Sequence, residues 1–193
     1  EGFRHLKPGG SVFIGDIRNL ELLEAFQAAV QLYKSAPSLP VRHLKEEVRR
    51  MASQEEELLI DPGLFLALKE RFPKITNIIV SPKMGIRANN ELASYRYDVS
   101  LTTDTATPSA DPDDVLWKDW SRDRLTISEI RQLLQGSGPH ILGITRIPNM
   151  RVIKDVKAFQ LIRDIDDDKK TVSDIRQDVQ HISGVNPEEL YRL

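Results

Sequence analysis

A short polar segment near the start of the chain could orient or bind a substrate. Asp16, Arg18 and Asn19 follow the apolar run Ser11–Ile14, in the order SVFIGDIRN. In an open α/β sheet, ligands bind just beyond the carboxyl ends of the strands. In such a fold these three residues would lie at the ligand-binding edge. Asp16 is a candidate orienting carboxylate, and Arg18 is its candidate partner or a clamp for substrate. An N-cap at Asn19 beside a surface ion pair would also explain these residues.

A second polar segment has the sequence NNELASYRYD and spans residues 89–98. Glu91 is a carboxylate that could accept a proton from an amine, and Arg96 could face the same pocket. Asn90 and Tyr97 complete the candidate binding residues of this segment. A hairpin loop would also explain the asparagines, and a strand edge would explain the tyrosines.

These segments resemble a known family. The LKPGG turn followed by a strand that ends in Asp resembles the fifth-strand region of class I S-adenosylmethionine-dependent methyltransferases. The GDIRN and NEL…YRYDV segments are similar to the methyltransferase domains embedded in nonribosomal peptide synthetases. The resemblance covers residues 1–103 and implies the C-terminal half of the methyltransferase core, part of a Rossmann-like sheet. It implies a small α/β extension over residues 104–193, after a polar linker and before the chain returns to an adenylation domain.

The resemblance implies methyl transfer from S-adenosylmethionine to the α-amine of an aminoacyl group carried by a carrier protein. Asp16 and Glu91 would then be the catalytic residues. The substrate would be bound by residues from both polar segments: Arg18, Asn19, Asn90, Arg96 and Tyr97. The glycine-rich cofactor loop of the family has no counterpart in this sequence, so no cofactor-binding residue is predicted. We expect the chain alone to bind the cofactor weakly or not at all.

Other functions remain open at this point. The chain could instead be a non-catalytic docking or linker module of a multidomain synthetase, with the charged helix expected at residues 41–57 contacting a neighbouring domain. A dehydrogenase fragment is disfavoured, because no acid–base pair for hydride transfer is evident. Nitrogen, carbon and oxygen all remain possible methyl acceptors.

Composition narrows the function classes. The chain has 193 residues, a net charge of −2 and no cysteine, which excludes disulfides and thiolate metal sites. The near-neutral charge favours neither nucleic acid nor an acidic membrane as a partner. No apolar run is long enough to span a bilayer. These features are compatible with the cytoplasm. The acidic runs Glu55–Glu57 and Asp166–Asp168 lack the ligand spacing of a calcium loop, so we expect solvated turns and no metal.

Hydrophobic periodicity predicts the elements that would position the candidate residues. The strand at Val12–Ile14 lacks alternation, which is typical of a strand covered on both faces. Periodicity also predicts strands at Ile75–Val80 and Tyr95–Leu101, joined by a polar connector over residues 81–94. The resemblance implies that these two strands form an antiparallel pair, whereas periodicity alone would also allow two unpaired strands. Caps and spacing predict further helices starting near residues 20, 41, 61, 126, 152 and 171, and a strand at Ile141–Ile147.

Overall fold

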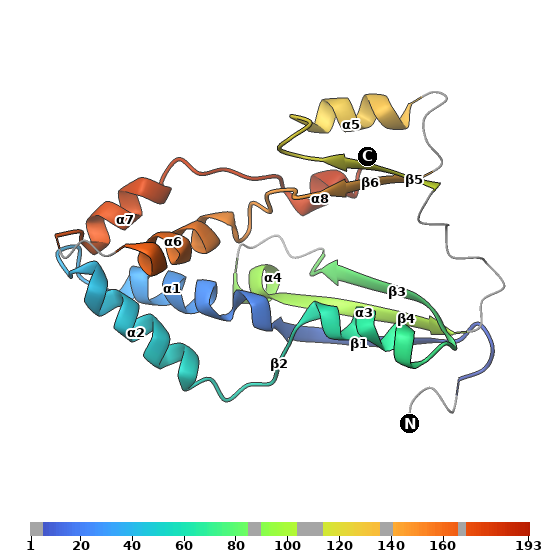
Figure 1. The fold of residues 1–193 in the computed structure, drawn as a ribbon, viewed down its shortest axis with the longest axis horizontal. Coiled ribbons are helices and arrows are strands. Elements are labelled where there is room, and N and C mark those ends of the chain that lie inside the picture. Colours follow the sequence, from blue (N-terminus) through green and yellow to red (C-terminus); the bar gives the residue numbers. More distant parts are fainter. Residues whose placement is uncertain (1–5, 85–89, 104–113, 136–140, 166–168) are drawn as a thin grey trace.

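The structure is a computed structural model that describes residues 6–84, 90–103, 114–135, 141–165 and 169–193. Two sheets and a layer of helices make up the fold (Figure 1). The predicted α/β class is confirmed, and the mixed sheet with its helices is consistent with a Rossmann-like fragment. The earlier elements are β1 (Ser11–Asn19), η2 (Leu20–Leu22), α1 (Leu23–Lys34), α2 (Val41–Ser53), β2 (Leu59–Ile60), α3 (Pro62–Arg71), β3 (Ile75–Pro82), α4 (Glu91–Tyr95) and β4 (Arg96–Thr103). The later elements are β5 (Val115–Asp119), α5 (Ile127–Leu134), β6 (Ile141–Thr145), α6 (Ile153–Asp164), α7 (Val172–Val179) and α8 (Pro187–Leu190).

The turn that enters β1 follows from its proline and glycines. The amide of Gly10 donates to the Lys7 carbonyl at 2.8 Å, and Gly9 has a φ of 76°. A type II turn needs a positive φ at its third residue, which glycine adopts without steric cost, and proline suits its second residue. The Gly9 amide also donates to the Thr103 carbonyl at 2.9 Å, so the turn fastens the start of β1 to the end of β4.

The larger sheet has the strand order β2-β1-β4-β3. β2 runs parallel to β1, whereas β4 is antiparallel to both of its neighbours. The predicted antiparallel pair is therefore confirmed, with Ile79 opposite Ser100. The polar connector was predicted wrongly in one respect. Its end folds into the short helix α4, and Tyr95 belongs to this helix and not to the strand.

β1 is longer than the sequence pattern predicts. GDIRN lies within the strand and not beyond it, because β1 continues to Asn19. The pairing with β4 is interrupted between Ile14 and Ile17 by a β-bulge, and Asp16 within it has a φ of 65°. A bulge leaves one residue unpaired and bends the strand locally, which is why Gly15-Asp16 looked like a loop in the sequence.

One face of the larger sheet carries its apolar core. Alternate residues of β4, including Val99 and Leu101, pack with Phe65 of α3 and are almost completely buried. On the opposite face, Phe13 is 68% exposed and Ile79 is 51% exposed. The expectation that β1 is covered on both faces was therefore wrong for the described residues, because they leave Phe13 largely exposed.

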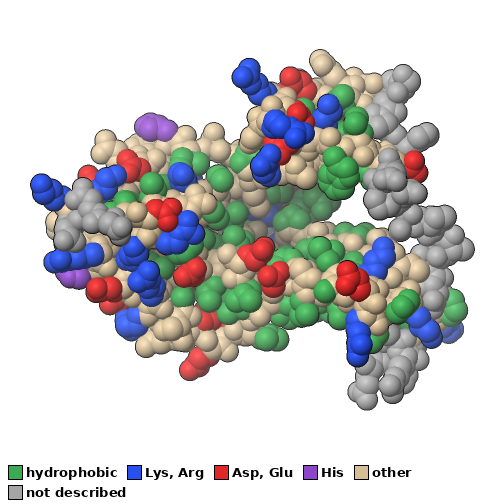
Figure 2. Space-filling model, viewed as in Figure 1, with side chains coloured by type: hydrophobic (Ala, Val, Ile, Leu, Met, Phe, Trp, Pro, Cys, Tyr) green, Lys and Arg blue, Asp and Glu red, His purple; other side chains and the backbone are tan. Residues whose placement is uncertain are grey.

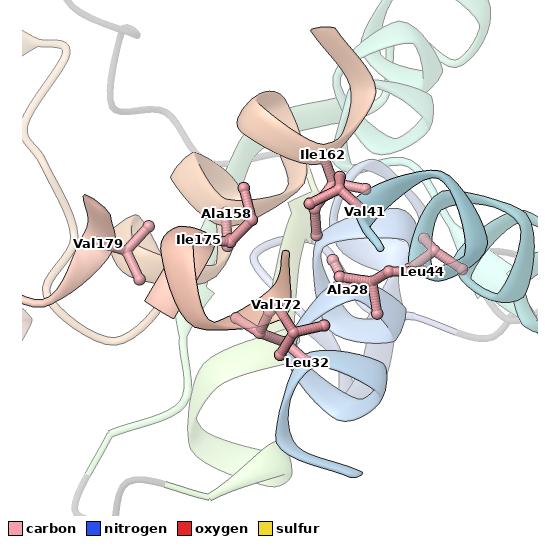
Figure 3. Packing of buried hydrophobic residues seen from close by; sticks show 10 residues of the cluster. Ala28, Leu32, Val41, Leu44, Ala158, Ile162, Val172, Ile175 and Val179 are labelled. Carbon is pink, nitrogen blue, oxygen red and sulfur yellow. The ribbon is translucent and has the colours of Figure 1, made fainter. Parts of the chain in front are cut away.

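A second apolar cluster joins four helices (Figure 3). Ala28 of α1 and Leu44 of α2 meet Ile162 of α6 and Ile175 of α7, and each is at most 1% exposed. Burying a leucine or isoleucine side chain contributes about 1.5–3 kcal/mol, so this layer supplies much of the stability. A backbone bridge between Pro40 and Thr171 closes the layer at one end.

The helical cluster draws residues from both sides of the predicted boundary at residue 103. α1 and α2 precede this boundary, whereas α6 and α7 follow it. The linker was predicted over residues 102–114, but Thr102 and Thr103 belong to β4. Residues 104–113 lie outside the described residues, so the division into two domains stays a prediction.

The smaller sheet is a parallel pair, β5 and β6, connected through α5. The strand at residues 141–147 was predicted, and its observed end is Thr145, but β5 was not foreseen. Figure 2 shows hydrophobic side chains gathered in a hollow between this β5–β6 unit and the strands of the larger sheet. Among the described helices, none has the length and apolar character needed to cross a bilayer.

Candidate active site

The bulge in β1 presents Asp16 at the surface. Its backbone amide donates to Asp98 Oδ1 at 2.9 Å, while its side chain is 55% exposed. Lys83 Nζ lies 3.0 Å from Asp98 Oδ1 and 3.6 Å from Asp16 Oδ1. Asp is one of the few residues besides glycine that tolerates a left-handed backbone, at a cost of about 1–3 kcal/mol. The bulge therefore turns a carboxylate away from the strand ladder and towards a lysine.

Arg96 connects the two polar segments of the sequence. Its guanidinium makes a two-pronged contact with Glu57, with Nη1 at 2.6 Å from Oε1 and Nη2 at 3.1 Å from Oε2. The same group reaches Glu91 Oε1 at 3.2 Å and Asp16 Oδ2 at 3.5 Å. Burial alone would lower the pKa of Arg96, but the carboxylates outweigh this effect and raise it. The side chain is thus a fixed positive charge among three carboxylates.

Arg18 is a second buried cation directly opposite Arg96 in the strand ladder. Its side chain is 6% exposed, and its Nη1 lies 2.8 Å from Glu55 Oε2 and 3.2 Å from Glu57 Oε2. The guanidinium carbon lies 4.9 Å from the ring centre of Phe26, a cation–π distance. Burial would raise the pKa of Glu55, but a backbone hydrogen bond from Glu57 and the charge of Arg18 lower it overall.

The structure brings together four of the predicted site residues. Asp16, Glu91 and Arg96 share the contacts just described, and Arg18 Nε lies 4.0 Å from Glu91 Oε1. We call these residues with Glu55 and Glu57 the β1-end cluster. They come from distant parts of the chain, so only the folded sheet joins them.

Three other predicted residues have evident structural contacts. The side chain of Asn19 accepts from the Glu21 amide at 3.0 Å, and that of Asn90 accepts from the Ala93 amide at 3.0 Å. Both are therefore helix caps. Tyr97 is 4% exposed, and its hydroxyl donates to the Ile60 carbonyl at 2.9 Å. Their roles in substrate binding stay predictions.

Glu55 and Glu57 were missed as members of the site. The sequence pattern predicts a solvated turn for this acidic run, at the end of a helix reaching residue 57. α2 in fact ends at Ser53, and the run leads into β2, which pairs with β1 at Arg18. No local spacing reveals this, because the two-residue strand β2 has no periodicity of its own.

The comparisons with known proteins identify the relatives. No family model matches the chain. It is 41% identical over 157 residues to chondramide synthase of Chondromyces crocatus and 30% identical over 166 residues to cyclosporin synthetase of Tolypocladium inflatum. It is also 24% identical over 196 residues to the beauvericin nonribosomal cyclodepsipeptide synthetase of Gibberella fujikuroi. Homologues of this chain are nonribosomal peptide synthetases.

The matches cover 79%, 84% and 98% of this chain but only 4%, 1% and 6% of these synthetases. The chain thus corresponds to one small region of very long synthetases. The synthetase relationship agrees with the resemblance drawn from GDIRN and NEL…YRYDV. The methyltransferase assignment is finer than these matches and is taken up below as a proposal.

A second carboxylate centre lies at the end of β5. Asp119 is 5% exposed and accepts from the Ser121 amide at 3.1 Å, the Arg122 amide at 2.8 Å and Thr145 Oγ1 at 3.3 Å. Arg146 also donates to it. The Arg122 amide is the largest cause that lowers the pKa of Asp119, burial opposes it, and the Arg146 guanidinium lowers the pKa further.

Within the described ranges, no three His, Asp or Glu side chains come together in a way that could hold a metal ion. A cavity of about 330 Å³ lies between β5 and α5, away from the β1-end cluster. It is lined by Lys118, Asp123, Leu125, Glu129, Gln132 and Leu133.

Proposed function

We propose that this chain is the later part of a methyltransferase domain of a nonribosomal peptide synthetase. The substrate would be an aminoacyl group on a carrier protein, with its α-amine as the methyl acceptor and an adenylation domain nearby. The observation that carries the proposal is the meeting of Asp16, Glu91 and Arg96, from the two segments that resemble the family. The synthetase homologues support the same context.

The cluster suits a transfer in which an amine loses a proton. S-adenosylmethionine, when bound, supplies an electrophilic methyl group. Arg96 and Arg18 both contact Oε1 of Glu91, and the Glu91 side chain is 43% exposed. Glu91 Oε2 can therefore accept the amine proton while the guanidinium groups hold the carboxylate in place. Asp16, whose side chain is 55% exposed, would orient the acceptor.

The cofactor itself fits this chain only in part. Its ribose and methionine groups need a glycine-rich loop after a strand, whereas Gly9 and Gly10 form the turn that precedes β1. We therefore assign no residue of this chain to cofactor binding. The described carboxylates and guanidinium groups are assigned to the acceptor and its proton.

Calorimetric titration of S-adenosylhomocysteine tests the proposal. It would compare this chain with a protein extended upstream by about 200 residues, the usual size of a domain. We expect binding to the longer protein only. An absence of binding to both would contradict the proposal and favour the docking interpretation, in which the exposed charged face of α2 contacts a neighbouring domain.

A further inference from the structure

The helix that carries Glu91 is too short to hold itself in place. α4 has five residues, one of which is Glu91 at its start. Isolated helices shorter than about 12 residues are marginal in water, so α4 must be fixed by what it packs against. Ala93 and Tyr95 are its buried residues, at 2% and 7% exposure.

Tyr95 ties the end of α4 to α6. Its hydroxyl donates to Asp155 Oδ2 at 2.6 Å, and its ring packs edge-on against Phe26, with ring centres 4.9 Å apart. Burial raises the pKa of Tyr95 and of Asp155 above their ordinary values. A buried hydroxyl that loses this acceptor would be left without compensation for its lost hydration.

Arg151 fixes the backbone around α4 from the same side. Its side chain is 8% exposed, and Nη1 donates to the carbonyls of Lys83 and Ala93, the latter at 3.2 Å. Nη2 reaches Glu188 of α8 at 3.4 Å. One guanidinium thus holds the chain both at the end of β3 and inside α4. The proposed catalytic machinery uses neither Arg151 nor Asp155.

We propose that Tyr95, Asp155 and Arg151 are positioning residues, through which residues 141–193 hold α4 so that Glu91 stays against Arg96. This inference rests on the proposed function, because it assigns Glu91 its role there. It gives the later segment a task in the reaction: its contacts set the position of the proton acceptor. α6 is otherwise part of the helical cluster, so the hydrogen bond from Tyr95 links the site to that group of buried residues.

Amide hydrogen exchange on this chain tests the structural claim, that these contacts hold α4 in place. The Ser94 amide donates to the Asn90 carbonyl at 3.0 Å and reports on α4. Tyr95→Phe should speed its exchange about fivefold, the effect of one hydrogen bond, and leave Ile130 of α5 unchanged. Tyr191→Phe, at a 62% exposed tyrosine, is the matched control and should change neither amide. Unchanged exchange at Ser94 in Tyr95→Phe would overturn the inference.

Kinetics of the longer, S-adenosylhomocysteine-binding protein test the functional claim, that these contacts position Glu91 for methyl transfer. Tyr95→Phe should lower kcat for methyl transfer about fivefold without changing KM for the carrier-bound substrate, and should add nothing in a Glu91→Gln background. An equal loss in both backgrounds would show that Tyr95 does not act through Glu91. Arg151→Lys should recover part of the kcat that Arg151→Met loses.

If the wild type binds no S-adenosylhomocysteine and transfers no methyl group, the proposed function fails and this inference fails with it. A normal wild-type rate with an unaffected Tyr95→Phe would overturn this inference alone.

Discussion

The two carboxylate centres of this molecule differ in where their partners come from. Asp119 is 5% exposed, and its donors all lie between residues 119 and 146, inside one β5-α5-β6 unit. Glu91 is 43% exposed and is held by Arg96 and Arg18, which reach it from two neighbouring strands. A carboxylate enclosed by local donors stabilises a turn. A half-exposed carboxylate held by cations from other elements is free on one side to meet a substrate.

The largest effect should come from removing Arg96. Arg96→Met leaves Asp16, Glu57 and Glu91 facing one another without their shared cation. We expect methyl transfer by the longer protein to fall about 100-fold or more, as when one preorganised donor is removed. The free energy of unfolding should fall by about 1–3 kcal/mol, below the value for a fully buried pair because Glu57 and Glu91 are partly exposed.

Single-turnover assays would measure the loss of methyl-transfer rate in Arg96→Met, and urea titrations would measure its loss of unfolding free energy. Arg96→Lys should recover stability more than rate, because an ammonium keeps the charge but not the two-pronged contact. Arg131→Met on the exposed face of α5 is the matched control. A wild-type rate of methyl transfer in Arg96→Met would show that the β1-end cluster takes no part in the reaction.

Asp119→Asn should affect stability and not the reaction. The lowered pKa of Asp119 means that its contribution is present above the ordinary pKa of an aspartate and is lost as pH falls through the lowered value. The unfolding temperature of the variant should therefore lie below that of the wild type at neutral pH, and the gap should narrow as the pH falls. Thermal unfolding from about pH 7 to about pH 2 measures this. Asp178→Asn, in a half-exposed pair with Lys170, should show a much smaller gap.

Asp155 should show the opposite pH dependence. Its pKa is raised, chiefly by burial, so its favourable contribution is present below the ordinary pKa and lost as pH rises through the raised value. Asp155→Asn keeps an acceptor for the Tyr95 hydroxyl but cannot ionise. The variant should gain unfolding temperature relative to the wild type as pH rises from about 4 to about 7. A constant difference in unfolding temperature between Asp155→Asn and the wild type over this range would show that Asp155 is not held in a desolvated position.

The smallest effect should come from Lys83. Lys83→Met removes the contacts to Asp98 and Asp16, whose side chains are 20% and 55% exposed. We expect a loss of less than about 1 kcal/mol in urea titrations, typical of ion pairs near the surface. Methyl transfer should fall only severalfold, because Arg96 still contacts Asp16. A loss as large as that of Arg96→Met would place Lys83, and not Arg96, at the centre of the cluster.

The sequence predicts the locally determined parts of this fold well. Thr126 with Glu129 forms the expected capping box, and Asp61 caps a helix that begins with Pro62. These motifs specify helix starts within a few residues, so periodicity and capping suffice. The antiparallel pair β3–β4 was also predicted, but from the family resemblance.

The missed features depend on contacts between distant residues. The bulge at Asp16 exists because β1 pairs with β4, some 80 residues away in the chain, and its polar residues gave no strand pattern. α4 forms only where Tyr95 and Ala93 are buried, and Glu57 meets Arg96 from the α2–β2 connection. The sequence therefore pointed to Asp16, Arg18, Glu91 and Arg96 as candidates, whereas their contacts with one another and with Glu55 and Glu57 required the fold.

The most direct test of this account is the single-turnover rate of methyl transfer by Glu91→Gln in the longer protein, measured beside Asp119→Asn and Glu70→Gln. Glu70 is exposed on α3 and serves as the matched glutamate control. We predict a fall of about 100-fold or more for Glu91→Gln, the usual contribution of a general base, and wild-type rates for the other two. A wild-type rate in Glu91→Gln would contradict the assignment of the β1-end cluster as the site of methyl transfer.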